Sequence, residues 1–139
     1  MEKRREFPTG ANRDIGKGKI QYIYFTHPLL EHSFGEYMMK NQYLPDGTIR
    51  SGDNWWAGWD KAISLDSLQR HVMDLRAIEA GYRVYKTRIV DLDTNETEEQ
   101  TLYTKKNKDD LPGYVEVTAE DCCNAVRFNA GAYLLQELK

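Results

Sequence analysis

The feature that most constrains this chain is a change in the spacing of its apolar residues. The spacing is typical of a helix before Gly81, differs between Gly81 and Thr118, and is helical again after Thr118. Before Gly81 and after Thr118, apolar residues recur at the spacing of one helix face. Between them, Tyr82–Val90 is rich in β-branched and aromatic residues, and Glu98–Thr104 continues this pattern after turn residues at 93–96. We therefore expect a β-hairpin inserted between two helices. The expected apolar faces are Leu65, Leu68, Val72, Leu75 and Ile78 in the first helix, and Ala119, Cys123, Val126, Ala130, Tyr133 or Leu134, and Leu138 in the second.

Capping residues predict where these two helices begin and end. Ser64 is the expected N-cap of the first helix, and Gly81 ends it. Thr118, with Asp121 three residues later, has the pattern of a capping box at the start of the second helix.

The first forty residues predict an arm and one more helix. Residues 1–20 hold glycines between charged residues and are expected to be irregular. After the apolar run Gln21–Phe25, Thr26 can cap a helix with Pro28 in its first turn, where the missing amide costs little. We expect this helix to fade near Asn41.

Together these patterns predict an α+β fold with a small core of about three helices. The hairpin insertion covers about residues 83–112, and Tyr114–Val117 is one more short strand. The length suits a single domain over residues 1–139. Because an isolated two-stranded hairpin is marginally stable in water, the hairpin should pack on its own body or on a second copy of the chain. We expect a homodimer or a higher homo-oligomer.

Composition and charge narrow the function classes. The net charge of −3 argues against binding of nucleic-acid polymers, because neutralising their phosphates needs a basic surface. No segment is long and apolar enough to span a bilayer, and Met1–Arg5 does not lead into the apolar run of a signal peptide. The adjacent Cys122 and Cys123 predict neither a disulfide framework nor a structural zinc site. These features predict a cytoplasmic protein without a membrane partner.

All three tryptophans fall within Ser51–Trp59, a loop flanked by glycines, and a helix with Arg70 and His71 follows. Tryptophan is costly to expose and usually anchors a core or a ligand face. The segment is therefore interpreted either as a loop folded onto its own core or as the rim of a stacking site that includes Asn54.

The carboxylates do not form a recognisable metal site. All-α nucleotide pyrophosphohydrolases hold magnesium with Glu-x-x-Glu on one helix and Glu-x-x-Asp on the next, because magnesium takes several hard oxygen ligands. Here the Glu-x-x-Glu at Glu96 and Glu99 falls within the expected hairpin. Two histidine–carboxylate pairs share a helix face but lack further ligands at a recognisable spacing. These pairs are His32 with Glu36 and His71 with Asp74. We expect no metal, no other cofactor and no catalytic residues.

The charged and aromatic residues fit ligand binding better than catalysis. Strand alternation pairs a ring with cations on each face of the hairpin, a combination that suits stacked bases and phosphates. One face carries Tyr82, Val84, Lys86 and Arg88, and the other carries Arg83, Tyr85, Thr87 and Ile89. The last helix places Arg127 and Asn129 beside Phe128. The alternative interpretation is a solvated hairpin and an arginine that snorkels from a helix.

Five further segments are distinctive: Arg5–Asp14, Gly35–Met38, Asp53–Trp55 with Gly58, Ser67–His71 with Asp74, and Glu120–Asn129. Together they resemble a phage-associated family, the N-terminal domains of dATP/dGTP diphosphohydrolases. The resemblance implies a phage protein that handles nucleotides in the host-cell cytoplasm. In size and layout the chain also resembles, more weakly, small phage proteins that defeat Thoeris immunity by trapping a cyclic ADP-ribose signal between the protomers of a dimer.

The first functional hypothesis is a nucleotide sponge that holds a cyclic ADP-ribose or related immune signal without turning it over. The second is a magnesium-dependent dATP/dGTP diphosphohydrolase that releases a monophosphate and pyrophosphate. The third is an interaction protein without a small ligand. The sponge would bind through Asn54, Arg70, His71, Tyr82, Arg83, Arg88, Arg127 and Asn129, and the hydrolase would need Glu36, Asp74, Glu79 and Asp121 to converge on magnesium.

Overall fold

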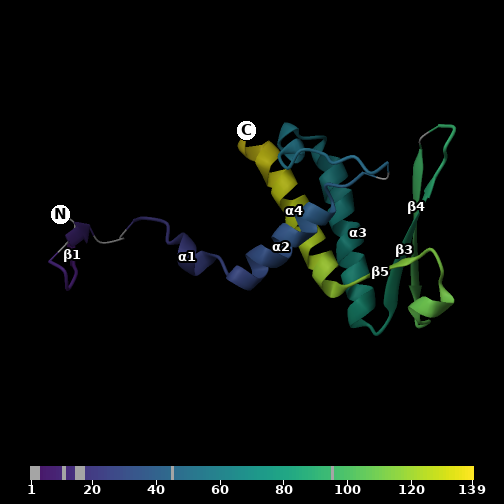
Figure 1. The fold of residues 1–139 in the computed structure, drawn as a ribbon, viewed down its shortest axis with the longest axis horizontal. Coiled ribbons are helices and arrows are strands. Elements are labelled where there is room, and N and C mark those ends of the chain that lie inside the picture. The colour runs from purple at the N-terminus through teal and green to yellow at the C-terminus, as the bar shows by residue number, and fades with distance from the viewer. Residues whose placement is uncertain (1–3, 11, 15–17, 45, 95) are drawn as a thin grey trace. The chain divides into compact units, whose positions relative to one another are not determined.

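The computed structural model describes residues 4–10, 12–14, 18–44, 46–94 and 96–139, and it confirms the α+β class. The chain divides into two compact units, Met1–His32 and Ser33–Lys139, which are described separately. The single domain over residues 1–139 stays a prediction. The elements, labelled where there is room in Figure 1, are β1 Arg4–Glu6, β2 Asn12–Asp14, α1 Tyr22–Phe25, α2 Pro28–Lys40, a 3-10 turn at Asn54–Ala57, α3 Lys61–Glu79, β3 Arg83–Val90, β4 Thr97–Thr104, a second 3-10 turn at Lys108–Asp110, β5 Val115–Val117 and α4 Ala119–Leu138.

The first unit contains a short hairpin where an irregular arm was expected. β1 and β2 pair antiparallel, with Arg5 opposite Arg13. The turn between them has Gly10 at a φ of +85°, and the Gly10 amide donates to the Phe7 carbonyl. The prediction was wrong here because strands of three residues are too short to show an alternating pattern.

Three helices carry most of the fold, and the C-terminal ends of two of them match the sequence. α2 ends at Lys40, close to the predicted end near Asn41. Thr26, the expected cap at its start, is instead the C-cap of α1, where its hydroxyl donates to the Tyr22 carbonyl at 2.8 Å. α3 ends with Gly81 at a φ of +96°, a backbone conformation that favours glycine. Its N-cap is Asp60 and not Ser64: the Asp60 carboxylate accepts from the Ala62 amide at 2.9 Å. Ser64 is instead buried one turn into the helix.

The last helix starts with the predicted capping box but buries a different face. The Thr118 side chain accepts from the Asp121 amide, and the Asp121 carboxylate accepts from the Thr118 amide. The buried residues lie one position away from the expected stripe, so Cys123 is exposed and Cys122 is buried. A polar residue can join this face because the Asn129 amide donates to the Ala125 carbonyl within the helix, at 2.8 Å. The buried face is Cys122, Asn124, Ala125, Asn129 and Ala132.

The inner face of α3 also differs from the apolar pattern. Ser64 and Asp74 are buried, whereas Leu65 and Val72, which were expected in the core, are exposed. Each buried polar side chain on this face has a partner from another segment: Ser64 accepts from the Trp59 indole, and Asp74 contacts the hairpin. Burial of a polar group costs little when it is hydrogen-bonded. Ser64 and Asp74 can therefore be buried, because partners from elsewhere in the chain bind them, although the apolar pattern predicted other residues in the core.

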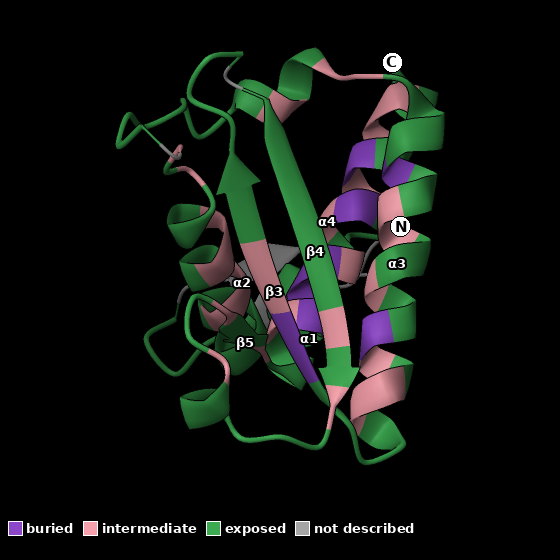
Figure 2. Ribbon diagram, turned by 90° about the vertical axis from the view of Figure 1, so that its right-hand side faces the viewer, coloured by how far each residue is buried: buried purple, intermediate pink, exposed green. Residues whose placement is uncertain are grey.

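The expected hairpin is part of a three-stranded antiparallel sheet in the order β4-β3-β5. β3 is central, with Val84 opposite Tyr103 on β4 and opposite Val117 on β5. Val84 and Tyr85 are buried, while the far end of the hairpin is exposed (Figure 2). The base of the hairpin therefore packs on its own body, where α3 contacts both α4 and β3.

Candidate functional site

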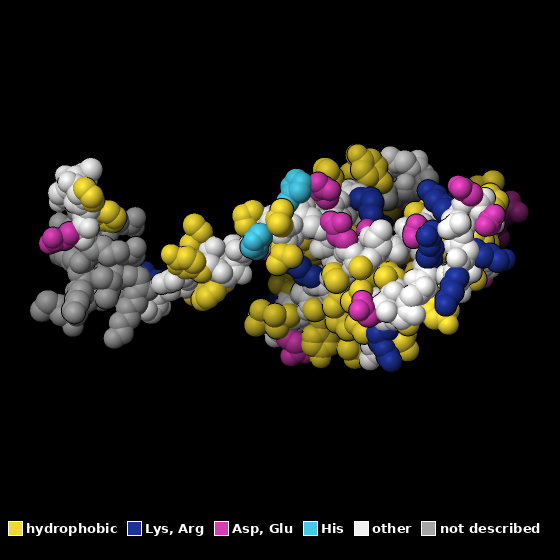
Figure 3. Space-filling view, turned by 90° about the horizontal axis from the view of Figure 1, so that it is seen from below, with side chains coloured by type: hydrophobic (Ala, Val, Ile, Leu, Met, Phe, Trp, Pro, Cys, Tyr) yellow, Lys and Arg dark blue, Asp and Glu magenta, His cyan; other side chains and the backbone are white. Residues whose placement is uncertain are grey.

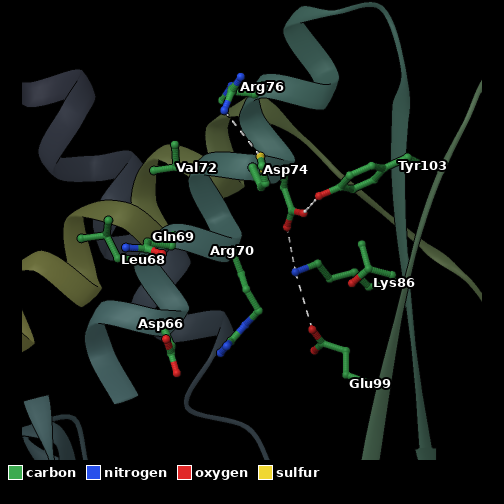
Figure 4. A pocket seen from close by; sticks show the side chains of 12 residues that line it. Asp66, Leu68, Gln69, Arg70, Val72, Asp74, Arg76, Lys86, Glu99 and Tyr103 are labelled. Atoms are coloured by element: carbon green, nitrogen blue, oxygen red, sulfur yellow. Dashed lines mark hydrogen bonds and ion pairs between the residues drawn. The ribbon is translucent and has the colours of Figure 1, made fainter. Parts of the chain in front are cut away.

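A buried carboxylate holds the hairpin against α3. Asp74 is 2% exposed. Its Oδ1 accepts from the Tyr103 hydroxyl at 2.6 Å, and its Oδ2 lies 2.9 Å from the Lys86 ammonium (Figure 4). Lys86 lies on β3 and Tyr103 on β4, so one carboxylate ties both strands to the helix. A charge is rarely buried unless it is paired, and here both partners come from the hairpin.

The network continues along the inner face of the hairpin. The Glu99 carboxylate lies 3.5 Å from Lys86 and 3.8 Å from the Arg88 guanidinium. We call Asp74, Lys86, Glu99 and Tyr103 the Asp74 cluster. Arg88 and Glu99 are direct cross-strand partners, so the register of β3 and β4 brings them to the same face.

Burial changes the titration of two groups beside Asp74. Burial, and then the hydrogen bond to Asp74, raises the pKa of Tyr103 to about 12, so this hydroxyl remains a donor. Burial, and then the charge of Lys86, lowers the pKa of His71 below its ordinary value of 6.5. His71 Nδ1 lies 4.0 Å from Asp74 Oδ2, which is too far for a hydrogen bond. His71 is therefore neutral at pH 7.

A hollow of about 780 Å³ lies between α3 and the hairpin. We call it the large hollow. Its lining combines the Asp74 cluster with apolar side chains of α3, including Leu68, Val72 and Met73 (Figure 4). Its volume falls in the range of small-molecule sites, and it pairs apolar surface with a few charged groups as such sites do.

A second hollow, of about 360 Å³, adjoins the first and shares Arg70, Lys86 and Glu99 with it. We call it the cationic hollow, because Lys40, Arg70, Lys86 and Arg88 line it from α2, α3 and β3. Lys40 is paired with Asp121 at 2.9 Å, and Lys86 and Arg88 are paired within the network. Arg70 differs from these three: it has no hydrogen bond or ion pair with any residue that the structure describes.

A third hollow, of about 280 Å³, contains the tryptophan loop. We call it the aromatic hollow. Trp55 and Trp59 pack against Phe128 of α4, with ring centroids 5.8 and 6.1 Å away. It shares Tyr37, Asn41 and Arg88 with the cationic hollow. Two rings therefore anchor the loop on α4, and the same rings line the hollow. The stacking site stays a prediction.

Four of the ligand residues expected from the sequence lie in these adjoining hollows. Arg70, His71 and Arg88 line the cationic hollow, and Asn54 and Arg88 line the aromatic one.

The other four lie outside the three hollows. Tyr82 lines a further hollow, which shares Met73, Arg76 and Tyr103 with the large one, and the Lys105 ammonium lies 5.4 Å from its ring centroid. Arg83 is exposed at the start of β3. The Arg127 guanidinium stacks 4.2 Å from the Phe34 ring centroid, and Asn129 is buried in α4.

The carboxylates of the hydrolase hypothesis have separate surroundings. Asp74 is buried in its cluster, and Asp121 caps α4 and pairs with Lys40. Glu36 is exposed on α2, and Glu79 is exposed in the last turn of α3. Within the described part of the chain, no three His, Cys, Asp or Glu side chains are grouped so as to hold a metal ion.

Sequence reasoning did not assign Lys86, Glu99, Tyr103 or Lys40 to the site. Lys86 was placed on the same hairpin face as Arg88, which was the available signal. No local pattern indicated Tyr103, because its pairing with Asp74 depends on the strand register.

None of the described helices has the length and hydropathy needed to cross a membrane. In the comparisons with known proteins, no family model, curated protein or solved structure matches this chain. The resemblances to the diphosphohydrolase N-terminal domains and to the Thoeris sponges therefore stay predictions.

Proposed function

We propose that this protein binds a small nucleotide and holds it without turning it over, with the phosphate in the cationic hollow. One observation carries the proposal: Arg70 lines a hollow with three other cations, and no described residue neutralises it. A guanidinium presents two parallel donors that match phosphate oxygens. A ligand phosphate supplies the partner that Arg70 lacks.

Three carboxylates, Glu99, Glu116 and Asp121, line the cationic hollow beside its four cations. Asp121 is matched by Lys40, and Glu99 by Lys86 and Arg88. These two carboxylates therefore act as charge partners for the cations, which argues for binding and against metal-assisted hydrolysis. The ligand class that the resemblance implies, cyclic ADP-ribose or a related phage-defence signal, carries both phosphate and base.

We also propose that a second copy of the chain covers the exposed apolar side chains of α3 beside the large hollow. Leu65, Val72 and Met73 are exposed on this helix, and their spacing of seven and eight residues places them on one face. Hydrophobic side chains gather over the helices and charged ones toward the hairpin (Figure 3). Val72 and Met73 also line the large hollow, so a second copy would close it. Met73→Glu is expected to yield a monomer in sedimentation velocity, while the unmodified chain sediments as a dimer.

The test of binding uses dATP, dGTP and cyclic ADP-ribose isomers, each with and without magnesium. The protein is separated from free nucleotide and denatured, and the released nucleotide is identified by chromatography. Intact nucleotide recovered without magnesium supports the proposal. A monophosphate and pyrophosphate that form only with magnesium would establish the diphosphohydrolase and refute it.

A matched pair of variants locates the phosphate. Arg70→Ala is expected to weaken binding about tenfold or more, because hydrogen bonds to charged groups contribute about 1.5 to 3 kcal/mol. Arg127→Ala is expected to change binding less than threefold, because Arg127 does not line the hollow. The reverse pattern would place the site on α4 and not in the cationic hollow.

A further inference from the structure

The aromatic hollow has a rigid back wall. Trp55 packs edge-on against Phe128, and Trp59 packs against the same ring at a tilt. The Trp59 indole donates to the buried Ser64 hydroxyl at 2.7 Å, which fixes its orientation. Because these rings already pack against one another and against Ser64, little entropy would be lost in ordering them around a flat ligand.

The charges that line the aromatic hollow favour an electron-rich or anionic ligand. Arg50 and Arg88 both line it, and no carboxylate does among the residues that the structure describes. The cationic hollow, in contrast, has Glu99, Glu116 and Asp121 among its lining residues as well as its cations. Arginine stacks on flat π systems as well as pairing with phosphate, so Arg88 can serve both hollows.

Its polar groups suit the edge of a ring with donors and acceptors. The Asn54 carboxamide and the Trp55 indole N–H make no hydrogen bond with the described residues, and both residues line the hollow. A carboxamide offers a donor and an acceptor side by side, which is the pattern that reads a base edge. Asn41 is already used, since its amide donates to the Tyr37 carbonyl.

The size and position of the hollow fit the base of the same ligand. Its volume of about 280 Å³ is below the range typical of whole drug-sized ligands, so it suits one ring system and not a complete nucleotide. It joins the cationic hollow through Tyr37, Asn41 and Arg88. A nucleotide can therefore place its base in one hollow and its phosphate in the other.

We infer that the aromatic hollow is a nucleobase site, with Trp55 stacking on the base and Asn54 reading its edge. This inference rests on the proposed function, because the phosphate site supplies the second anchor. It adds that the base contributes to recognition and that Arg88 lies at the junction between base and phosphate.

The experiment compares probes that carry base, phosphate or both. Adenosine, guanosine, their 5′-monophosphates and ribose 5-phosphate are titrated by calorimetry and by tryptophan fluorescence. The nucleosides and monophosphates are expected to quench the fluorescence, whereas ribose 5-phosphate binds without quenching. Trp55→Phe should weaken binding of the best nucleoside several-fold, since base stacking on an aromatic ring is commonly worth a tenfold change. The matched control is Trp56→Phe, which changes the neighbouring tryptophan, 56% exposed and outside the hollow.

Asn54→Ala, at an exposed position, tests the same site without disturbing the packed rings, and circular dichroism checks that all variants fold. Monophosphate binding that is equal in both tryptophan variants and in Asn54→Ala would overturn the base site while leaving the phosphate site intact. Nucleoside binding that depends on Trp55, with no gain from a phosphate, would keep the base site and refute the proposed function. No binding of any probe would overturn both.

Discussion

Replacing Lys86 with methionine tests whether the Asp74 cluster holds the hairpin to α3. The substitution keeps most of the side-chain volume but leaves Asp74, at 2% exposure, without its cation. Removing one partner of a buried ion pair typically costs about 3 to 5 kcal/mol. The Lys86 side chain is 18% exposed and the Tyr103 hydroxyl still donates, so we expect the lower end, about 3 kcal/mol. For a chain of this length that corresponds to a fall in Tm of about 12 °C.

The assay is urea unfolding followed by circular dichroism, combined with a double-mutant cycle. Asp74→Asn in the Lys86→Met background removes the uncompensated charge, so the double variant should recover more than 1 kcal/mol relative to Lys86→Met. The sum of the two single-variant changes in unfolding free energy would then differ from the change in the double variant by more than the roughly 0.5 kcal/mol seen for independent sites. Additive effects would refute the reasoning that this contact fixes the hairpin.

Three further predictions concern individual side chains. In the native protein Ellman's reagent should modify Cys123 but not Cys122, because burial raises the Cys122 pKa to about 11; equal reaction of both thiols would contradict the buried face of α4. Because the pKa of His71 is lower in the folded protein than in the unfolded chain, the unfolded chain takes up a proton at a higher pH as the solution is acidified. Its contribution to stability is therefore complete above pH 6.5 and is lost as the pH falls through the native pKa. His71→Gln should reduce the loss of stability between pH 7 and pH 5 in urea titrations, and an unchanged loss would refute this. Glu99→Gln should strengthen phosphate binding by up to about fivefold, because it removes a half-exposed competitor for Lys86; weaker binding would contradict the charge balance of the hollow.

The sequence predicted the order of the elements from α2 onward well, because that order depends on local patterns. The switch of period at Gly81 located the hairpin, and the capping box at Thr118 located the start of α4. Which face of each helix is buried was harder to predict from the sequence. Polar residues such as Asp74 and Asn129 are buried because of partners that hydropathy does not describe, so the buried face of α4 lies one residue away from the apolar stripe.

The candidate site was only partly predictable for a related reason. Arg70 and His71 are neighbours in sequence, and Arg88 was correctly grouped with Lys86 on one face of the hairpin. Which helix that face meets depends on how the hairpin packs, and nothing in the local pattern determines it. Arg127 shows the converse: it lies in a segment that suggested a ligand site, yet its guanidinium stacks on Phe34.

The same contacts that position the hairpin also form the proposed site, so folding and binding are linked here. Lys86 pairs with buried Asp74 on one side and with Glu99 on the other. A phosphate entering the cationic hollow competes with Glu99, which is half exposed and costs little to release into water. It does not displace Asp74, whose burial without a partner would cost several kcal/mol. The ligand can therefore recruit Lys86 and Arg88 while the hairpin stays docked, which is the arrangement expected of a site that binds tightly without a large conformational change.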